Sequence, residues 1–273
     1  MPVRSQLQPY GATVSGVKIS VVIIAQDEQR TVGRVLEAVR PIAWEVILVD
    51  SGSTDQTKEI ASEQGAKVIH QDWLGYSAQK NFAMSQATGD WLLSLDADEV
   101  ITPELAAEIK ELFVAGIPAG VNGYKIPRLF FIGETAIKRG GFYPDSQLRL
   151  IRRSTGHFKD RIVHESISIS GKTIELSNPM YHYAYKDLQQ YEQTMEKYAR
   201  LSAQHYFSQK FSPWRAHILN EALHPMWTFF YRFIIRQGFL DGMLCLKLNL
   251  IYADYVRKKI HYLRELSTQQ TRS

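Results

Sequence analysis

Four short apolar segments stand out in the first hundred residues: Ile19–Ala25, Glu45–Asp50, Lys67–His70 and Trp91–Asp96. Their hydrophobic positions are continuous and rich in Val and Ile, which is typical of strands that are buried on both faces. The stretches between them, residues 31–39, 57–64 and 76–86, have apolar positions at helical spacing. Strands that alternate with helices predict βαβ units, and therefore an α/β fold with a mostly parallel sheet flanked by helices.

Two of the apolar segments end in aspartate, at Asp50 and at Asp96. In an open parallel sheet, ligands bind beyond the carboxyl ends of the strands. Either aspartate alone could be a helix cap or a turn residue. Two aspartates at corresponding strand ends instead predict a functional site at that edge of the sheet.

The turn after the first strand, residues 25–30, contains no glycine. A dinucleotide site needs G-x-G-x-x-G at this place, and a P-loop needs G-x-x-x-x-G-K-[ST], so that phosphates can approach the backbone. Neither pattern is present. The sequence therefore argues against a glycine-cradled NAD or ATP site.

Asp96 and Asp98 form a D-A-D motif directly after the fourth predicted strand. In an extended chain, residues i and i+2 project to one side, so both carboxylates can face one ligand. Hard oxygen ligands of this kind suit Mg²⁺ or Mn²⁺ that carries substrate phosphates. The alternative is a solvated turn before a helix that begins near Pro103.

These motifs, taken together, resemble the GT-A nucleotide-sugar glycosyltransferases of family 2. The resemblance covers residues 18–102 and rests on I-S-V-V-I-I from Ile19, V-D-S-G-S-T-D-Q-T from Val49, Q-K-N from Gln79 and D-A-D from Asp96. It implies a Rossmann-like GT-A fold and a nucleotide-sugar donor, such as a UDP-sugar. The first turn differs from the family's Pro-x-x-Asn-Glu pattern, so only the role of Glu28 carries over directly.

The resemblance also implies roles for particular residues. The turn at Gln26 and Glu28, together with Asp50, would hold the base and ribose of the donor, and Ser53 would be a further donor contact. Asp96 would contact the ribose or diphosphate, and Asp98 would bind a divalent metal, Mn²⁺ or Mg²⁺. Lys80 can supply a flexible positive charge to a phosphate, although a lysine at such a position can also be an ordinary surface residue.

The next part of the chain, residues 103–185, is expected to form the acceptor half of the same domain. P-D-S-Q-L-R-L-I-R-R from Pro144, V-H-E from Val163 and H-Y from His182 resemble the WaaE-like transferases, which add sugars to the lipopolysaccharide inner core. This resemblance implies a lipopolysaccharide or related glycolipid acceptor. A polyisoprenyl phosphate or a protein remains an alternative acceptor.

An inverting transfer needs a carboxylate that takes the proton of the attacking hydroxyl. Glu165 is the first choice for this base, and the alternative is a surface residue of a hairpin. Asp145 is the second choice; it could instead bind the acceptor, order its loop or be a turn residue after Pro144. His164 and His182 could complete the metal site or be packed core histidines. Arg149 could bind the diphosphate or an anionic acceptor, or belong to a strand with one solvated face.

Residues 186–273 are expected to form a helical extension, after an N-terminal tail at residues 1–17 and the transferase domain at 18–185. Asp187-Leu-Gln-Gln190 has the pattern of a capping box. An apolar stripe follows at helical spacing and predicts core packing: Leu188, Tyr191, Met195, Tyr198 and Leu201.

The extension is also basic. The chain carries a net charge of +4, and residues 210–265 contain nine Lys or Arg against four Asp or Glu. Apolar and aromatic side chains alternate with arginines from Met226 onward, which suits a helix lying at an anionic membrane surface. Packing on the transferase domain or on a second subunit is the alternative. A nucleic-acid-binding protein is a further alternative, but RNP, KH, zinc-finger and helix-turn-helix signatures are absent from the sequence.

Composition agrees with this picture. The chain is 45% hydrophobic and 22% charged, which is enough for a globular core, and its single cysteine excludes a disulfide framework. No signal-peptide pattern and no stretch of about 18 uncharged apolar residues occurs. We therefore expect a cytoplasmic protein that is peripheral on the inner membrane, with oligomerisation open and no nucleic-acid partner.

Overall fold

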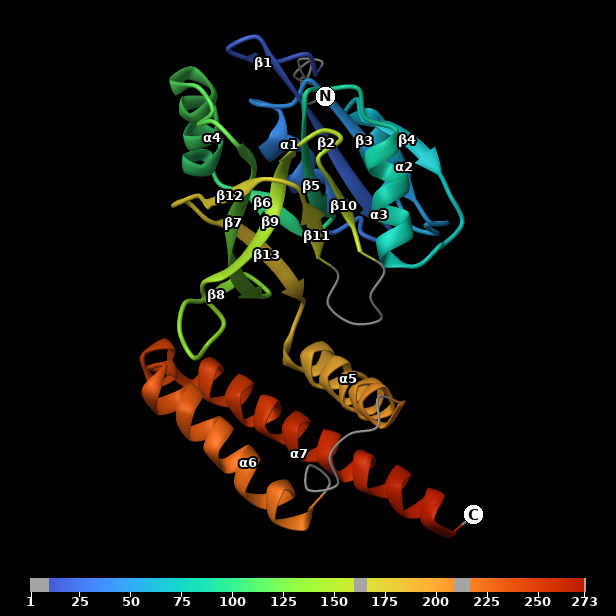
Figure 1. The fold of residues 1–273 in the computed structure, drawn as a ribbon, viewed down its shortest axis with the longest axis vertical. Helices are drawn as coiled ribbons and strands as arrows, with labels where there is room; N and C mark the ends of the chain where they lie inside the picture. Colours follow the sequence, from blue (N-terminus) through green and yellow to red (C-terminus); the bar gives the residue numbers. More distant parts are fainter. Residues whose placement is uncertain (1–9, 160–165, 209–216, 273) are drawn as a thin grey trace, which may run out of the picture. The chain divides into compact units, whose positions relative to one another are not determined.

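The structure, a computed structural model, describes residues 10–159, 166–208 and 217–272 (Figure 1). The chain divides into two compact units. The first contains the described residues up to Leu129 together with Asp145–Tyr183. The second contains Phe130–Pro144 and the described residues from Ala184 onward. The predicted domain limit at residue 186 stays a prediction.

The first unit is built on a sheet whose first half is parallel. Its strands lie in the order β4 (Lys67–His70), β3 (Glu45–Asp50), β2 (Val17–Ala25) and β5 (Trp91–Asp96). The connecting helices are α1 (Val32–Val39), α2 (Thr57–Glu63) and α3 (Tyr76–Ser85). The four strands and three helices predicted from the apolar pattern are confirmed within one to two residues.

Helices cover both faces of this parallel half. Alternate β2 residues, such as Val21 and Ile23, pack in one core cluster with α1 and α4 (Pro103–Ala115), whereas Val22 packs in another with α3. A strand that is apolar on both faces needs such cover. The predicted helix near Pro103 is therefore confirmed, and the Thr102 hydroxyl caps it by accepting the Leu105 N–H at 3.0 Å.

Beyond β5 the strands pair mainly antiparallel. The sheet continues through β9 (Asp145–Arg152), β7 (Val121–Ile132), β13 (Met180–Tyr185) and β6 (Glu99–Ile101). Shorter strands complete the description: β1 (Thr13–Val14) on β2, β8 (Thr135–Ile137) and β12 (Lys172–Glu175) on β7, and the separate pair β10 (Gly156–Phe158) and β11 (Ile167–Ile169). The predicted α/β fold, a sheet flanked by helices with a C-terminal helical extension, is confirmed.

The sheet curls upon itself. β6 begins three residues after β5 ends, yet three other strands separate them along the sheet. Three residues span at most about 10 Å, so the far end of the sheet must return to the end of β5. Side chains from β5, β9, β7, β13 and β6 can consequently meet inside the curl.

The second unit is helical. It contains α5 (Leu188–Ser208), α6 (Ile218–Phe230), a π-helical turn η2 (Tyr231–Ile235), a 3₁₀ turn η3 (Gly238–Asp241) and α7 (Gly242–Arg272). Asp187 caps α5 by accepting the Gln190 N–H at 2.8 Å, as the capping pattern predicts. Among the described residues, no helix is both long enough and apolar enough to cross a membrane.

Two expectations for this unit need correction. The apolar stripe of α5 does not pack along its whole length, because Tyr198 and Leu201 are 47% and 44% exposed. The small residues Ala199 and Ala203 are buried instead, which lets α5 and α7 approach closely. Arg232 does not face outward either: its Nε donates to Asn249 at 2.9 Å, and its guanidinium stacks on Phe142 and Tyr252.

Candidate functional site

The predicted site residues of the parallel half meet at one edge of the sheet. In the strand register, Ala25 lies beside Asp50, and Ile24 lies beside Asp96. The turn after β2, the loop after β3 and the D-A-D turn after β5 therefore start side by side. The two aspartates therefore lie at one edge of the sheet, and the functional site expected there stays a prediction.

The turn after β2 is held by the loop after β3. Asp27 adopts a left-handed conformation with φ of 56°, which Asp and Asn tolerate better than most residues. Its Oδ1 accepts the Thr54 N–H at 2.7 Å, and its own N–H donates to Ser53 Oγ at 3.0 Å. Gln26 is exposed beside it. Ser53 thus fixes the turn after β2, and its expected contact with a donor stays a prediction.

Asp50 is completely buried, and its carboxylate organises its own loop. Oδ2 accepts the N–H groups of Gly52 and Ser53 at 2.9 and 3.0 Å. Gly52 has a φ of 95°, a conformation that favours glycine. Asp50 therefore has the turn-forming role that the sequence left open. A contact with a nucleoside would be a second role for the same carboxylate.

The Q-K-N motif lies on α3, and each of its residues contacts a different part of the site. Gln79 donates to Ser51 Oγ and to the Gln71 carbonyl, both at 3.0 Å. Asn81 exchanges two hydrogen bonds with the backbone of Phe158 on β10. Between them, the Lys80 Nζ lies 2.7 Å from Asp96 Oδ1. Lys80 is only 5% exposed, which excludes the ordinary surface role.

Asp96 is held between two cations. Its Oδ1 contacts Lys80, and its Oδ2 accepts from Arg149 Nη2 at 2.7 Å. Although burial opposes the shift, Arg149 and Lys80 hold the pKa of Asp96 far below its usual range. Asp96 is therefore a fixed anion in a fixed orientation.

Arg149 is paired inside the protein. Its Nη2 also donates to Glu99 Oε1 at 2.5 Å, and Arg149 is 5% exposed. Its expected contact with a diphosphate stays a prediction. In the structure it orients Asp96 and neutralises Glu99, so we describe it as a positioning residue.

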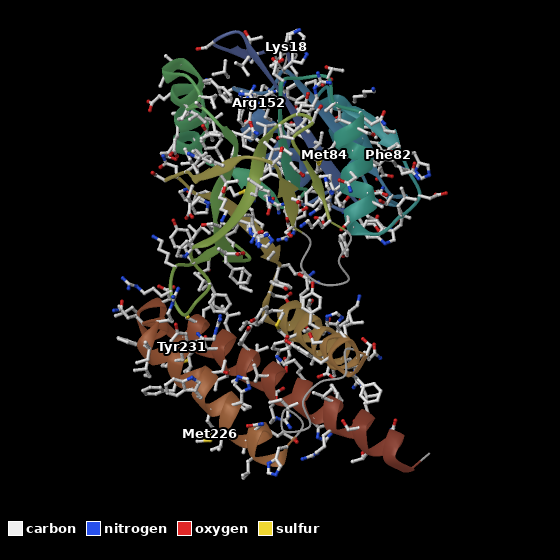
Figure 2. All side chains as sticks on the ribbon, viewed as in Figure 1. Lys18, Phe82, Met84, Arg152, Met226 and Tyr231 are labelled. Atoms are coloured by element: carbon white, nitrogen blue, oxygen red, sulfur yellow. The ribbon has the colours of Figure 1, made fainter. Side chains whose placement is uncertain are left out.

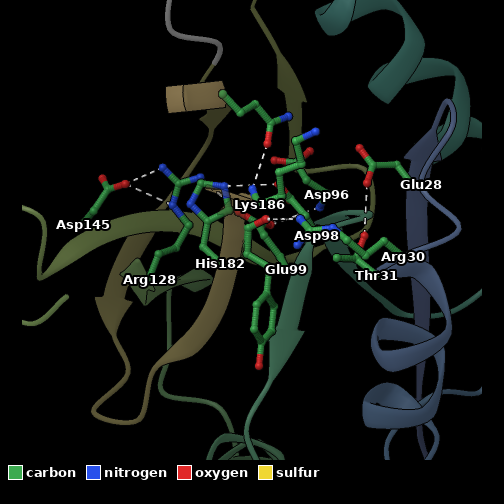
Figure 3. Close-up of polar contacts among 12 residues, drawn as sticks. Glu28, Arg30, Thr31, Asp96, Asp98, Glu99, Arg128, Asp145, His182 and Lys186 are labelled. Atoms are coloured by element: carbon green, nitrogen blue, oxygen red, sulfur yellow. Dashed lines mark hydrogen bonds and ion pairs between the residues drawn. The ribbon is translucent and has the colours of Figure 1, made fainter. Parts of the chain in front are cut away.

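Glu99 connects these groups to the antiparallel strands. It is fully buried, and its Oε2 accepts the Asp96 N–H at 3.0 Å. Its Oε1 also accepts from Arg128 Nη1 at 3.0 Å, and Arg128 forms a two-pronged ion pair with Asp145 (Figure 3). Although partial burial opposes it, Arg128 lowers the pKa of Asp145. Four strands of the curl thus contribute one charged network: Asp96, Glu99, Arg128, Asp145 and Arg149.

Asp98 is the carboxylate of this site that is left incompletely paired. His182 Nε2 lies 3.5 Å from Asp98 Oδ2, and the hydrogen bond and charge of Asp98 raise the pKa of His182 although burial opposes the shift. Within the described chain, Asp98 Oδ1 is buried and has no hydrogen-bond partner. Burial, followed by the charge of Asp98, raises the pKa of Glu28 to about 7.

These features fit a divalent cation at Asp98. A buried carboxylate oxygen without a partner, next to a second carboxyl group, is a favourable place for a hard cation. The described residues do not bring three or more His, Cys, Asp or Glu together as a complete metal site. Asp98 and His182 are thus the two described side chains that could hold such a cation. His164 and Glu165 lie outside the described residues.

The sequence interpretation missed Glu99, Arg128, Asp27 and Thr57 as site residues. Thr57 Oγ1 accepts the Glu28 N–H at 2.8 Å and so fixes the end of the first turn. For Glu99, the sequence did contain a signal. A charged residue directly before the apolar pair Val100-Ile101 needs a partner of opposite charge if that segment is buried.

Replacement of Glu99 by Gln tests the network. The amide oxygen can still accept from the Asp96 N–H, but Arg128 and Arg149 lose a buried counter-charge. Removal of one partner from a buried ion pair typically costs about 3 kcal/mol or more. We expect chemical denaturation to show a loss of about that size for Glu99→Gln, and no measurable loss for Glu63→Gln on the exposed end of α2. Equal stability of both variants would contradict the network.

Comparison with known proteins places this site in a family. The sequence pattern described as "Glycosyl transferase family 2" matches residues 20–157. An uncharacterized glycosyltransferase of Rickettsia typhi is 33% identical over 262 residues, which is 92% of this chain and 88% of that protein. The lipopolysaccharide core biosynthesis glycosyltransferase LpsC of Rhizobium meliloti is 31% identical over 165 residues, 56% of this chain and 58% of LpsC.

One solved structure is similar to part of this chain. It is glucosyl-3-phosphoglycerate synthase from Mycobacterium tuberculosis, in complex with Mg²⁺ and UDP, with a TM-score of 0.36 and 24% identity. The alignment covers 42% of this chain and 44% of that one, so the likeness is confined to less than half of either protein.

Proposed function

Because the chain belongs to glycosyl transferase family 2, we propose that this glycosyltransferase moves glucose from UDP-glucose to a glycolipid of the lipopolysaccharide inner core, with inversion at the anomeric carbon. The observation that carries the proposal is the pair of Asp96 and Asp98 at the carboxyl ends of the strands. Asp96 is locked by Lys80 and Arg149, whereas Asp98 keeps a buried, unpartnered oxygen.

Asp98 and His182 would hold a divalent cation, Mn²⁺ or Mg²⁺. Such an ion supplies positive charge to the diphosphate leaving group. The residues of the chain would do the positioning. The turn at Gln26–Glu28 and the loop at Asp50–Ser53 start next to Asp96, and we propose that they hold the nucleoside. The choice of UDP and glucose follows from the resemblance of the sequence.

The proton of the acceptor hydroxyl would go to Glu165. Asp145, the other candidate, forms an ion pair with Arg128 and accepts from Gln147 at 2.8 Å. A carboxylate with a lowered pKa that is held in this way is a weaker base than an unpaired one. This pairing argues against Asp145 as the base and gives it the task of orienting Arg128, while Glu165 is proposed from the resemblance of the sequence.

The acceptor is proposed from similarity. LpsC, which matches just over half of this chain, is described as a lipopolysaccharide core enzyme. A lipid-borne acceptor requires the enzyme to work at a membrane surface, and we place it as a peripheral protein on the cytoplasmic face of the inner membrane.

A transfer assay tests the proposal. The purified protein is incubated with Mn²⁺, with UDP-glucose, UDP-galactose or GDP-mannose, and with truncated lipopolysaccharide, a polyisoprenyl phosphate or no acceptor. We expect the mass of the truncated lipopolysaccharide to rise by one hexose with UDP-glucose. Transfer only to the polyisoprenyl phosphate would replace the proposed acceptor, and transfer only from GDP-mannose would replace the proposed donor.

A further inference from the structure

An apolar face covers the helical hairpin of the second unit. Large apolar side chains that are 43–68% exposed recur at helical spacing along α6 and η2 and continue into η3 and α7. We call this set the apolar face: Leu219, Leu223, Met226, Trp227, Phe230, Tyr231, Ile234, Ile235, Phe239, Leu240, Met243 and Leu250. Figure 2 labels two of its members, Met226 and Tyr231.

The exposure of this face is too extensive for isolated surface residues. Single exposed apolar side chains are normal, but a contiguous apolar surface marks a place of interaction. The hairpin has its own core on the other side, where Cys245 and Leu248 of α7 pack with Tyr191 of α5. The apolar face is therefore not required for the internal packing of the helices.

Basic side chains border the face at its η3 end. Arg236 and Lys247 are exposed, and in the described part of the chain neither side chain forms an ion pair. Lys138 and Arg139 are exposed on a loop whose backbone N–H groups donate to Asp241 at 2.6 and 2.7 Å. These hydrogen bonds bring the cationic side chains of Lys138 and Arg139 close to η3, and they engage the carboxylate of Asp241. The acidic residue of α6, Glu221, pairs with Arg264 at 2.8 Å.

We infer that the apolar face is the surface by which this protein binds an anionic lipid bilayer. An amphipathic helix with Trp, Phe and Leu on one side and Lys or Arg at its border lies in the plane of the interface. Trp227 and Tyr231 have the amphipathic rings that favour the headgroup level. The cations at the η3 end would contact anionic headgroups. The inference deepens the proposed function, because a lipid-borne acceptor places the enzyme at such a surface.

Vesicle flotation of the full chain tests the inference. We expect the protein to float with phosphatidylcholine vesicles that contain phosphatidylglycerol, and to float much less with phosphatidylcholine alone or at high salt. Met226→Gln/Trp227→Gln should weaken binding at least about tenfold, because two large apolar groups lose their burial. The matched control is Val114→Gln/Leu201→Gln, which removes two exposed apolar groups outside the face and should bind like the wild type.

A charge pair tests the basic border separately. Arg236→Gln/Lys247→Gln should lower affinity for the anionic vesicles by about fivefold per residue. Lys110→Gln/Lys125→Gln removes the same charge from exposed positions of the first unit and should leave the affinity unchanged.

Several outcomes would overturn the inference. The wild type could stay unbound and sediment as a dimer that Met226→Gln/Trp227→Gln converts to monomer, in which case the face is a subunit interface. It could bind RNA and ignore vesicles, in which case the basic border serves nucleic acid. UDP binding, measured without vesicles, separates the two proposals: a protein that floats but binds no nucleotide retains the membrane face and loses the proposed reaction.

Discussion

Asp98→Ala should lower turnover by about 10³-fold or more, because charge stabilisation by a bound metal ion is worth several kcal/mol. Its partly buried carboxylate is the one group of the D-A-D turn with an unpartnered oxygen, whereas Asp96 is held by Lys80 and Arg149. Steady-state assays with varied Mn²⁺ would measure the effect.

The same substitution should not unfold the protein. Within the described chain, the one ion pair of Asp98 is its 3.5 Å contact with His182. Removal of the Asp98 charge also relieves its repulsion with Glu28. We expect the thermal midpoint to change little, and Asp98→Asn to lose activity as Asp98→Ala does. Asp72→Ala, at an exposed position, is the matched control. Turnover of Asp98→Ala within tenfold of the wild type, with unchanged metal dependence, would refute the metal assignment.

Glu165→Gln should lower the chemical rate by about 10²- to 10⁴-fold and leave nucleotide affinity nearly unchanged, because it removes only the general base. Single-turnover kinetics and UDP titration would measure the two effects separately. Glu63→Gln, on exposed α2, serves as the control.

Asp145→Asn provides the comparison for the base. Because Asp145 holds Arg128, this variant should act through the network and impair stability together with binding. If Glu165→Gln turns over like the wild type and Asp145→Asn loses only the chemical step, the base assignment passes to Asp145.

The parallel half of the fold could be predicted from the sequence because its signals are local. Continuous apolar runs such as Ile19–Ala25 and Glu45–Asp50 are typical of strands that are buried on both faces. The D-S-G-S-T-D and D-A-D motifs follow those strands directly, so their position at one edge of the sheet also follows from the chain order.

The curled half could not be predicted in the same way. Its strands pair antiparallel across long separations, as in the pairing of β13 with β6, where His182 lies beside Glu99. The pairing of Arg149 with Asp96 and Glu99 could not be predicted from its own segment, because both partners lie on other strands. The contact of Arg232 with Asn249 could not be predicted either, because Asn249 is seventeen residues away along the chain.

The central claim is that Asp96 and Asp98 form a metal-assisted nucleotide-sugar site, and a thermal-shift screen against UDP, GDP, CMP and their sugars, with and without Mn²⁺, tests it most directly. We predict stabilisation by UDP and UDP-glucose that increases with Mn²⁺ and is lost in Asp98→Ala. The absence of a shift with every nucleotide, or an equal shift in the wild type and Asp98→Ala, would contradict the claim.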